Sequence, residues 1–196
     1  MVQKYKGIQG STILWLYILC YIYPMQTPEA RRFAKTLAFV QKHLPEASRI
    51  LDLGTPNDLA NFIANAGYTV QNTKGENLDT DYHDFLNTDA DCVTAFEIFE
   101  HMLAPFNILH QLKTPKLIAS VPLKLWFAPA YWNTKDDWDK HYHEFEPKQF
   151  DYLLERSGWN IKDSMVWASP DYGKIGIRPL LRYITPRYYM VYCERA

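Results

Sequence analysis

The stretch Arg49-Ile-Leu-Asp-Leu-Gly54 decides the fold, because it is a short apolar strand that ends in a glycine. Apolar residues follow at positions 59, 62, 63 and 66, the spacing of one helix face, and Gly67 is a favourable place for the helix to stop. A second strand resumes over 68–73. A strand, a glycine turn, a helix and a strand form a βαβ unit, which implies parallel strands joined by a right-handed crossover.

The rest of the chain extends this unit into an alternating α/β pattern. We predict helices at 27–44, 105–112 and 147–157, and strands at 92–97, 117–121, 159–167 and 188–193. The segment 75–91 is too short for a helix and a strand, so one crossover is expected to be trimmed, and the stretch between the last two strands is expected to be a loop. The pattern predicts a single-domain, doubly wound, mostly parallel α/β sheet, with 1–45 as an N-terminal helical cap and 46–196 as the α/β domain.

The composition indicates one folded domain of modest charge. The chain has 196 residues, 47% of them hydrophobic, and a formal net charge of −1. Such a balance does not signal a nucleic-acid-binding face, so we expect no nucleic-acid partner. The excess is aromatic, with 6 Trp, 14 Tyr and 10 Phe, and many of these rings fall in 13–23 and 126–142. Both segments lie outside the predicted βαβ core and are expected to cover its ligand-binding edge or to face a partner.

Three cysteines and one apolar run bear on location. Cys20, Cys92 and Cys193 form no C-x-x-C pair, and their odd number argues against a disulfide framework, so reduced thiols and a cytoplasmic location are expected. The apolar run 12–23 is shorter than the ~20 residues of a membrane-spanning helix, and Pro24 stops it. We interpret this run as a helix that packs on the domain without stable membrane insertion. A membrane-surface or signal segment is the alternative.

The first candidate site lies at the end of the predicted strand 49–54. Open α/β sheets bind ligands at the carboxyl ends of their strands, and Asp52 and Gly54 lie at such an end. A glycine there lets a ligand approach the backbone, and the helix that follows offers free N–H groups. A plain strand-to-helix turn is the competing interpretation.

Two further groups contain histidines. Glu97, Glu100 and His101 follow the next strand, and two carboxylates with an imidazole could relay protons or hold a divalent ion, unless they form a solvated helix start. His141 and His143 point the same way if their segment is extended, as a base or a ligand pair would. The alternative for this pair is a surface loop, or a helix entry in which Glu146 caps the chain.

In this order, the segments resemble the class I S-adenosylmethionine-dependent methyltransferases, and most closely the branch of the ubiquinone-biosynthesis O-methyltransferases. The resemblance covers about residues 30–195. Four stretches carry it: Arg49–Gly54 as the first motif, Phe96–Met102 as the Glu-x-x-Glu-His stretch, Leu117–Pro122 as the following strand, and His143–Pro147 through Gly158-Trp159 as a helix entry and exit.

The resemblance implies roles for individual residues. Asp52, Gly54, Phe96 and Glu97 would bind the cofactor S-adenosylmethionine. His101 or His143 would serve as the base, with Glu100 beside it. The aromatic residues of 126–142, and not the resemblance, indicate a small, aromatic or otherwise apolar acceptor. In the quinone branch the positions of Glu97, Glu100 and His101 are associated with a divalent ion, although nothing in this sequence requires a metal. The oligomeric state is left open.

The sequence also departs from the family pattern. Of the glycines in the first motif only Gly54 remains, with Pro56 and Asp58 in place of the others, and the second strand ends without an acid for the ribose, so that Glu76 or Asp79 would have to reach back. These departures motivate a second hypothesis, a degenerate member that keeps the fold as a binding or interaction module. A third is a different α/β enzyme that uses Glu97, Glu100 and His101 with a metal.

Overall fold

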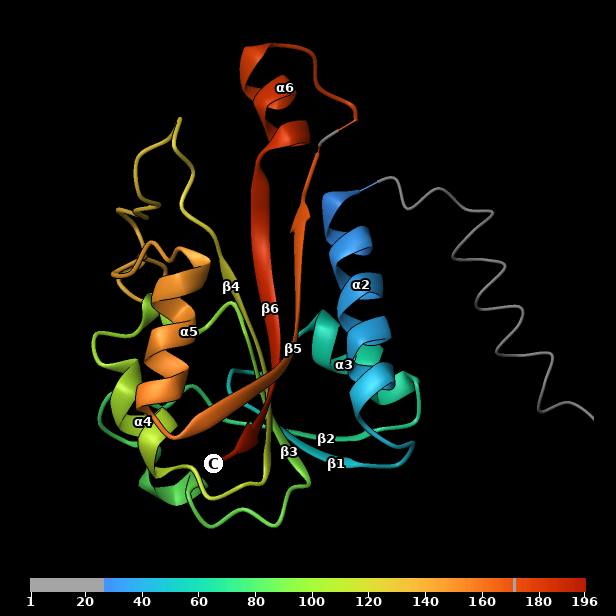
Figure 1. Cartoon of the computed structure of the whole chain (residues 1–196), viewed down its shortest axis with the longest axis vertical. Helices are drawn as coiled ribbons and strands as arrows, with labels where there is room; N and C mark the ends of the chain where they lie inside the picture. Colours follow the sequence, from blue (N-terminus) through green and yellow to red (C-terminus); the bar gives the residue numbers. More distant parts are fainter. Residues whose placement is uncertain (1–26, 171) are drawn as a thin grey trace, which may run out of the picture.

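Residues 27–196, apart from residue 171, are described by a computed structural model (Figure 1). They form a six-stranded sheet of order β2-β1-β3-β4-β6-β5. The strands are β1 (Arg49–Asp52), β2 (Thr69–Asn72), β3 (Cys92–Phe96), β4 (Lys116–Pro122), β5 (Trp159–Ala168) and β6 (Pro186–Arg195). The first four pair in parallel, and β6 runs antiparallel to both β4 and β5. Five strands therefore share one direction, which confirms the predicted α/β sheet.

Helices cover both faces of this sheet (Figure 1). One face carries α2 (Pro28–His43) and α3 (Asp58–Asn65), and the other carries α4 (Pro105–Gln111) and α5 (Pro147–Arg156). Each face has its own buried cluster, and adjacent residues of β1 alternate between them. Ile50 belongs to the cluster that includes Val40 of α2, whereas Leu51 belongs to the cluster that includes Leu154 of α5. This alternation is the period-two pattern of a strand that is buried on both faces.

Local capping explains where the helices begin. The Thr27 hydroxyl accepts a hydrogen bond from the Ala30 N–H at 3.1 Å, and the Asn57 side chain accepts from Ala60 N–H at 3.0 Å. Glu146 and Gln149 form a reciprocal capping box at the start of α5, as the helix-entry alternative for the preceding histidines predicts. Each cap satisfies an N–H that the first helical turn leaves without a partner.

The structure confirms one predicted connection between strands and corrects another. Between β2 and β3 the described residues form no strand, only a short 3-10 turn at Tyr82–Phe85, so the trimmed crossover is confirmed and β2 is an edge strand. The predicted loop between β5 and β6 is wrong in part, because it contains α6 (Ile177–Ile184). Three prolines obscured this helix, yet Pro179 lies in its first turn, where a missing N–H costs little.

Several predictions concern the chain termini and thiols. Residues 1–26 lie outside the described part of the structure, and with them Cys20, the apolar run 12–23 and most of the predicted cap. Cys92 and Cys193 are buried free thiols, as predicted. Among the described helices, none is long and apolar enough to cross a membrane.

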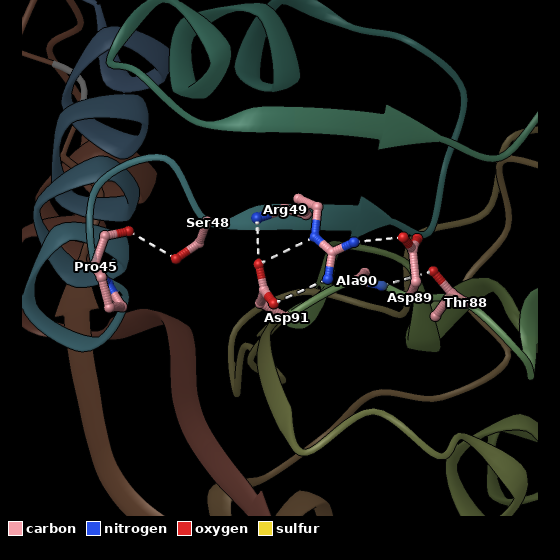
Figure 2. Close-up of polar contacts among 7 residues, drawn as sticks. All are labelled: Pro45, Ser48, Arg49, Thr88, Asp89, Ala90 and Asp91. Atoms are coloured by element: carbon pink, nitrogen blue, oxygen red, sulfur yellow. Dashed lines mark hydrogen bonds and ion pairs between the residues drawn. The ribbon is translucent and has the colours of Figure 1, made fainter.

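The amino end of β1 is held by exposed charges, which Figure 2 shows. The Arg49 backbone N–H donates to Asp91 Oδ2 at 2.8 Å, and the Arg49 guanidinium contacts both Asp91 and Asp89. The backbone bond, followed by the side-chain bond, lowers the pKa of Asp91 below its usual value. These contacts tie the start of β1 to the segment that leads into β3.

Candidate functional site at the carboxyl ends of the strands

A cavity of about 380 Å³ lies where the chain reverses its direction across the sheet. From β1 the chain proceeds to β2 on one side and then to β3 on the other, and such a switch point is where open α/β sheets bind ligands. Residues 52–55, 57–59 and 96–98 line the cavity, together with Glu29, Arg32 and Phe33 of α2. The structure thus brings together the four residues that the sequence proposed for a cofactor, Asp52, Gly54, Phe96 and Glu97.

Asp52 ends β1 as a buried carboxylate. Its Oδ1 accepts a hydrogen bond from the Thr94 hydroxyl at 2.6 Å, and its Oδ2 accepts from Asn72 Nδ2 at 2.9 Å. Burial raises the pKa of Asp52 to about 6, against the opposing effect of these two hydrogen bonds. Asp52 is therefore a desolvated acid whose charge is only partly compensated, which is typical of binding and catalytic sites.

Gly54 forms a turn that a side chain would disturb. Its φ is +151°, and a Cβ atom on it would lie 3.3 Å from Ile98 Cδ1. Its N–H donates to Thr73 Oγ1 at 2.9 Å, and its carbonyl accepts from Asn72 Nδ2 at 3.2 Å. The end of β2, where the family pattern has an acid, thus holds the glycine turn in place.

Glu76 and Asp79 were expected to reach back toward the cavity, and they do not line it. The Glu76 carboxylate accepts from the Lys74 N–H at 2.6 Å. The Asp79 carboxylate accepts from the N–H groups of Leu103 and Ala104, just before α4. Both acids stabilise local backbone, so the expectation that one of them replaces the missing acid of β2 is not supported by their contacts.

Glu97 follows β3 in an unusual backbone conformation. Its φ of +59° lies in the left-handed region, which is uncommon outside glycine and concentrates at functional sites. Its Oε1 accepts from the Ser120 hydroxyl at 2.8 Å, and its Oε2 lies 3.9 Å from Arg32 Nη1. Burial raises the pKa of Glu97, and the charge of Arg32 opposes this effect.

The charges around the cavity are unequal. Four carboxylates line it, those of Glu29, Asp52, Asp58 and Glu97, whereas Arg32 is the one guanidinium among the lining residues. Arg32 comes from a helix that sequence reasoning did not connect with the site, because its register facing the sheet is a tertiary property. An acid-rich cavity with a single basic group favours a ligand of net positive charge that also carries one anionic group.

A second cluster lies next to the cavity residues. Glu100 and His101 belong to the 3-10 turn Phe99–His101, and His141 comes from the irregular segment before α5. One side-chain ligand atom from each of the three lies within 4.8 Å of the others. Glu100 is 1% exposed, and its Oε2 has no hydrogen-bond partner among the described residues. Burial first, and then the nearby Glu97, raise the pKa of Glu100 well above its usual value.

Both imidazoles of this cluster have a hydrogen-bond acceptor at Nδ1. His101 Nδ1 lies 3.1 Å from the Lys140 carbonyl oxygen, and His141 Nδ1 lies 3.1 Å from Glu144 Oε1. An acceptor at Nδ1 fixes the ring and leaves Nε2 for a proton, a substrate or a metal ion. Burial lowers the pKa of His141, which favours the neutral ring.

The predicted pair His141 and His143 is divided between two environments. His141 packs against the His101 ring with centroids 4.9 Å apart, whereas His143 stacks on Phe145. The His143 Nε2 is buried and has no hydrogen-bond partner among the described residues. The trio that sequence suggested, Glu97 with Glu100 and His101, is also different in the structure, because Glu97 bonds to Ser120 and His141 takes its place in the cluster.

The aromatic segment 126–142 does not line the cavity. The aromatic rings in the cavity wall are Phe33 and Phe96. Trp126, Trp132 and Trp138 are all more than half exposed. The expectation that these rings cover the cavity is therefore not met, and the contribution of this segment to the site is His141.

Solved structures with the same fold include methyltransferases. The 1,6-didemethyltoxoflavin-N1-methyltransferase of Burkholderia thailandensis, solved with 1,6-didemethyltoxoflavin and S-adenosylhomocysteine, is 15% identical, and the match covers 100% of this chain and 93% of that one with a TM-score of 0.59. An S-adenosylmethionine-dependent methyltransferase of Mesorhizobium loti is 18% identical over 81% and 96%, with a TM-score of 0.50. The [4+2]-cyclase SpnF is 12% identical over 82% and 80%, also at 0.50.

Sequence comparison adds nothing to this likeness. No family model matches the chain, and no curated protein matches it. At identities this low the structural matches establish a Rossmann-like methyltransferase fold. The cyclase among them illustrates that one fold supports different reactions, so the reaction has to be argued from the site.

Proposed function

We propose that this protein is an S-adenosylmethionine-dependent methyltransferase that acts on a small, aromatic or otherwise apolar acceptor. The observation that carries the proposal is the acid-rich cavity at the switch point of a methyltransferase-type sheet. S-adenosylmethionine carries a sulfonium, an ammonium and one carboxylate. Four carboxylates and one guanidinium complement these charges. The motifs at Phe96–Met102 and His143–Pro147 support kinship with the ubiquinone-biosynthesis branch.

The residues around the cavity fit this cofactor in kind. Gly54 provides a turn that a Cβ would fill, Asp52 and Glu97 suit its ammonium group, and Arg32 suits its carboxylate. Phe96 offers a ring face to a sulfonium through cation–π attraction. When bound, S-adenosylmethionine supplies an already activated methyl group, so the protein has to supply positioning and a base.

We assign the base to His101, with Glu100 as its neighbour. The Lys140 carbonyl holds Nδ1 of His101, which leaves Nε2 to accept a proton from the hydroxyl of the acceptor. Glu100, whose pKa burial raises, lies beside this ring, with its Oε1 3.7 Å from Nε2. His143, whose Nε2 is buried without a partner among the described residues, is the second candidate for the base.

Calorimetric titration with S-adenosylmethionine and S-adenosylhomocysteine tests the proposal. We expect saturable heat for both ligands, with tighter binding of the sulfonium form because the cavity is acidic. The variant Asp58→Asn should narrow this preference, whereas Asp84→Asn, which changes an acid outside the cavity lining, should keep it. A folded wild-type protein that gives no heat with millimolar S-adenosylmethionine contradicts the proposal.

The alternative, a degenerate member of the fold without transfer activity, also has an observation in its favour. Both the N–H and the carbonyl of Gly54 are bonded to residues of the β2 end, which occupies the backbone groups that a ligand would use. Incubation with methyl-labelled S-adenosylmethionine and a panel of phenols, catechols and aromatic amines separates the two. Label in the acceptor supports the enzyme, and binding without transfer supports the alternative.

A metal-dependent enzyme is a further candidate because Glu100, His101 and His141 converge. The two Nδ1 acceptors behind the histidines match the arrangement that orients metal-bound imidazoles. Titration of the metal-free protein with Zn²⁺ should then show one tight site. His141→Ala should remove this site, while His83→Ala, a histidine outside the cluster, should not. Equal Zn²⁺ binding by the wild type and His141→Ala would eliminate this candidate.

A further inference from the structure

Helix α6 projects from the sheet beyond the other elements (Figure 1). It connects the end of β5 to the start of β6, and none of its residues is buried. Ile177, Leu180 and Ile184 lie on one helical face at i, i+3 and i+7 and are 80%, 64% and 74% exposed. Ile175 just before the helix is fully exposed. An apolar stripe of this kind on a protruding helix is typical of a surface that contacts a membrane or another protein.

Aromatic side chains border this stripe. Tyr172 and Tyr183, both exposed, contact each other edge to face with centroids 5.4 Å apart. Trp126, which is 71% exposed, donates from its indole N–H to the hydroxyl of Thr185 at 3.3 Å. Amphipathic rings of Trp and Tyr are the side chains that prefer the boundary between water and lipid.

The charge of this region favours one kind of occupant. Residues 169–187 contain Lys174, Arg178, Arg182 and Arg187 and a single acid, in a chain whose overall charge is −1. The Nε of Arg182 is buried without a hydrogen-bond partner among the described residues. Two copies of such a basic surface would repel each other, which disfavours self-association through α6. A surface of negative charge with an apolar interior fits both the stripe and its basic flanks.

The position of α6 relates this surface to the candidate site. β6 pairs antiparallel with β4 and places Tyr188 opposite Pro122, so α6 lies beyond the carboxyl end of β4, at the edge of the sheet that carries the cavity. Arg31 of α2 lies over the Tyr172 ring at 4.5 Å and donates to the Pro170 carbonyl. The first turn of α2, which contributes Glu29 to the cavity, is thus tied to the segment that leads into α6.

From these observations we propose that α6, with Tyr172, Tyr183 and Trp126 around it, docks this protein on the surface of an anionic lipid bilayer. The apolar stripe enters the boundary between headgroups and acyl chains, and the arginines contact the lipid phosphates. Docking of this kind turns the cavity edge of the sheet toward the membrane. The inference does not depend on the proposed methyltransferase activity.

Vesicle flotation of the full chain tests the docking. The wild type should float with vesicles of phosphatidylcholine containing about one third phosphatidylglycerol and bind at least about tenfold more weakly to phosphatidylcholine alone. The variant Ile177→Ser/Leu180→Ser/Ile184→Ser should lose at least about tenfold in binding to the anionic vesicles. Arg178→Gln/Arg182→Gln should bind both kinds of vesicle with similar, weak affinity.

A matched control removes apolar side chains that are exposed elsewhere. Leu103→Ser/Phe106→Ser changes two exposed residues at the start of α4 and should bind vesicles like the wild type. Circular dichroism should show every variant folded, because α6 contributes no buried residue and both Leu103 and Phe106 are exposed. A wild type that does not float with anionic vesicles, or an α6 variant that floats as well as the wild type, overturns the proposal. So does a wild-type dimer that the α6 variant converts to a monomer without a change in vesicle binding.

Discussion

Strand β1 begins and ends with charged residues. The charge at its amino end is exposed and ion-paired, whereas the carboxylate at its carboxyl end is buried without a basic partner among the described residues. At the amino end, exposed Arg49 contacts Asp89 and Asp91, and the pKa of Asp91 lies below its usual value (Figure 2). At the carboxyl end, Asp52 is buried, its partners are a hydroxyl and an amide, and its pKa is raised to about 6. Folding thus favours the ionised acid at one end and disfavours it at the other.

The unfavourable features gather where the ligand cavity is. Glu97 and Glu100 have raised pKa values because of burial, and Glu97 also has a left-handed backbone. The paired charges at the amino end stabilise the sheet without forming a cavity. Desolvated acids reduce stability and are retained at sites where a ligand or a reaction uses them. The contrast supports the proposal that the carboxyl end is the functional end, and the following experiments can break or sharpen it.

The largest effect is expected from a side chain at the glycine turn. Gly54→Val should abolish saturable binding of S-adenosylmethionine, because the new Cβ would lie 3.3 Å from Ile98 Cδ1 within the cavity wall. Gly67→Val is the matched control, since Gly67 also has a positive φ, of +101°, but open space around its Cβ. Both variants should lose about 1–3 kcal/mol of stability from backbone strain. Unchanged calorimetric affinity in Gly54→Val would show that the cavity is not the binding site.

The next effect concerns the pH dependence of stability. The folded-state pKa of Asp52 is about 6, above its ordinary value of 3.8. Its protonated form therefore contributes stability that is present below about pH 4 and lost as the pH rises through about 6. Relative to Asp52→Asn, the wild type should therefore lose up to about 3 kcal/mol between these limits. Urea unfolding at a series of pH values measures the difference.

Asp91→Asn supplies the opposite sign at the other end of β1. The pKa of Asp91 is lower in the folded than in the unfolded state. Its ionised form therefore contributes stability at pH values above the unfolded-state pKa, and this stability is lost as the pH falls through the folded-state pKa. The wild type should therefore gain stability relative to this variant as the pH rises. If the stability difference between the wild type and the variant changes with pH in the same direction for Asp52→Asn and Asp91→Asn, the contrast between the two ends is refuted.

A smaller effect is expected at the two non-glycine residues with positive φ. Ala47, in the exposed turn before β1, has a φ of +62°, close to the +59° of Glu97. Ala47→Gly should raise the stability by ~1 kcal/mol and leave ligand binding unchanged, because glycine adopts this conformation without steric cost. Glu97→Gly relieves the same strain but should weaken binding of S-adenosylmethionine. Thermal unfolding and calorimetry measure both quantities, and equal affinities in the two variants would argue against a role for Glu97.

The smallest effect is expected at the exposed ion pairs of Figure 2. Arg49→Gln should lower the midpoint of thermal unfolding slightly, and the decrease should fade as salt is added, because solvent and ions screen exposed charges. Arg156→Gln, at the end of α5, serves as a surface control. A large decrease that persists at high salt would mean that the amino end is not held by screened surface charge.

The sequence by itself determined the framework of the protein, because the signals for it are local. The apolar run that ends in Gly54 predicts a strand, the residues after Gly54 predict the helix that crosses over, and Thr27 and Glu146 mark helix starts that their hydrogen bonds confirm. The shortness of 75–91 predicts the trimmed crossover that the structure contains. Hydrophobic periodicity, helix capping and segment length each depend on a few neighbouring residues, so they can be recognised in the sequence alone.

The tertiary structure alone decided the composition of the site. Arg32 reaches Glu97 because α2 packs across the sheet, and His141 reaches His101 from forty residues further along the chain. The same long-range packing turns Glu97 toward Ser120, and it leaves α6 exposed at the cavity edge of the sheet. No local sequence pattern predicts these long-range contacts. They follow from which strands pair and which faces are buried, and the free energy that selects them belongs to the whole fold.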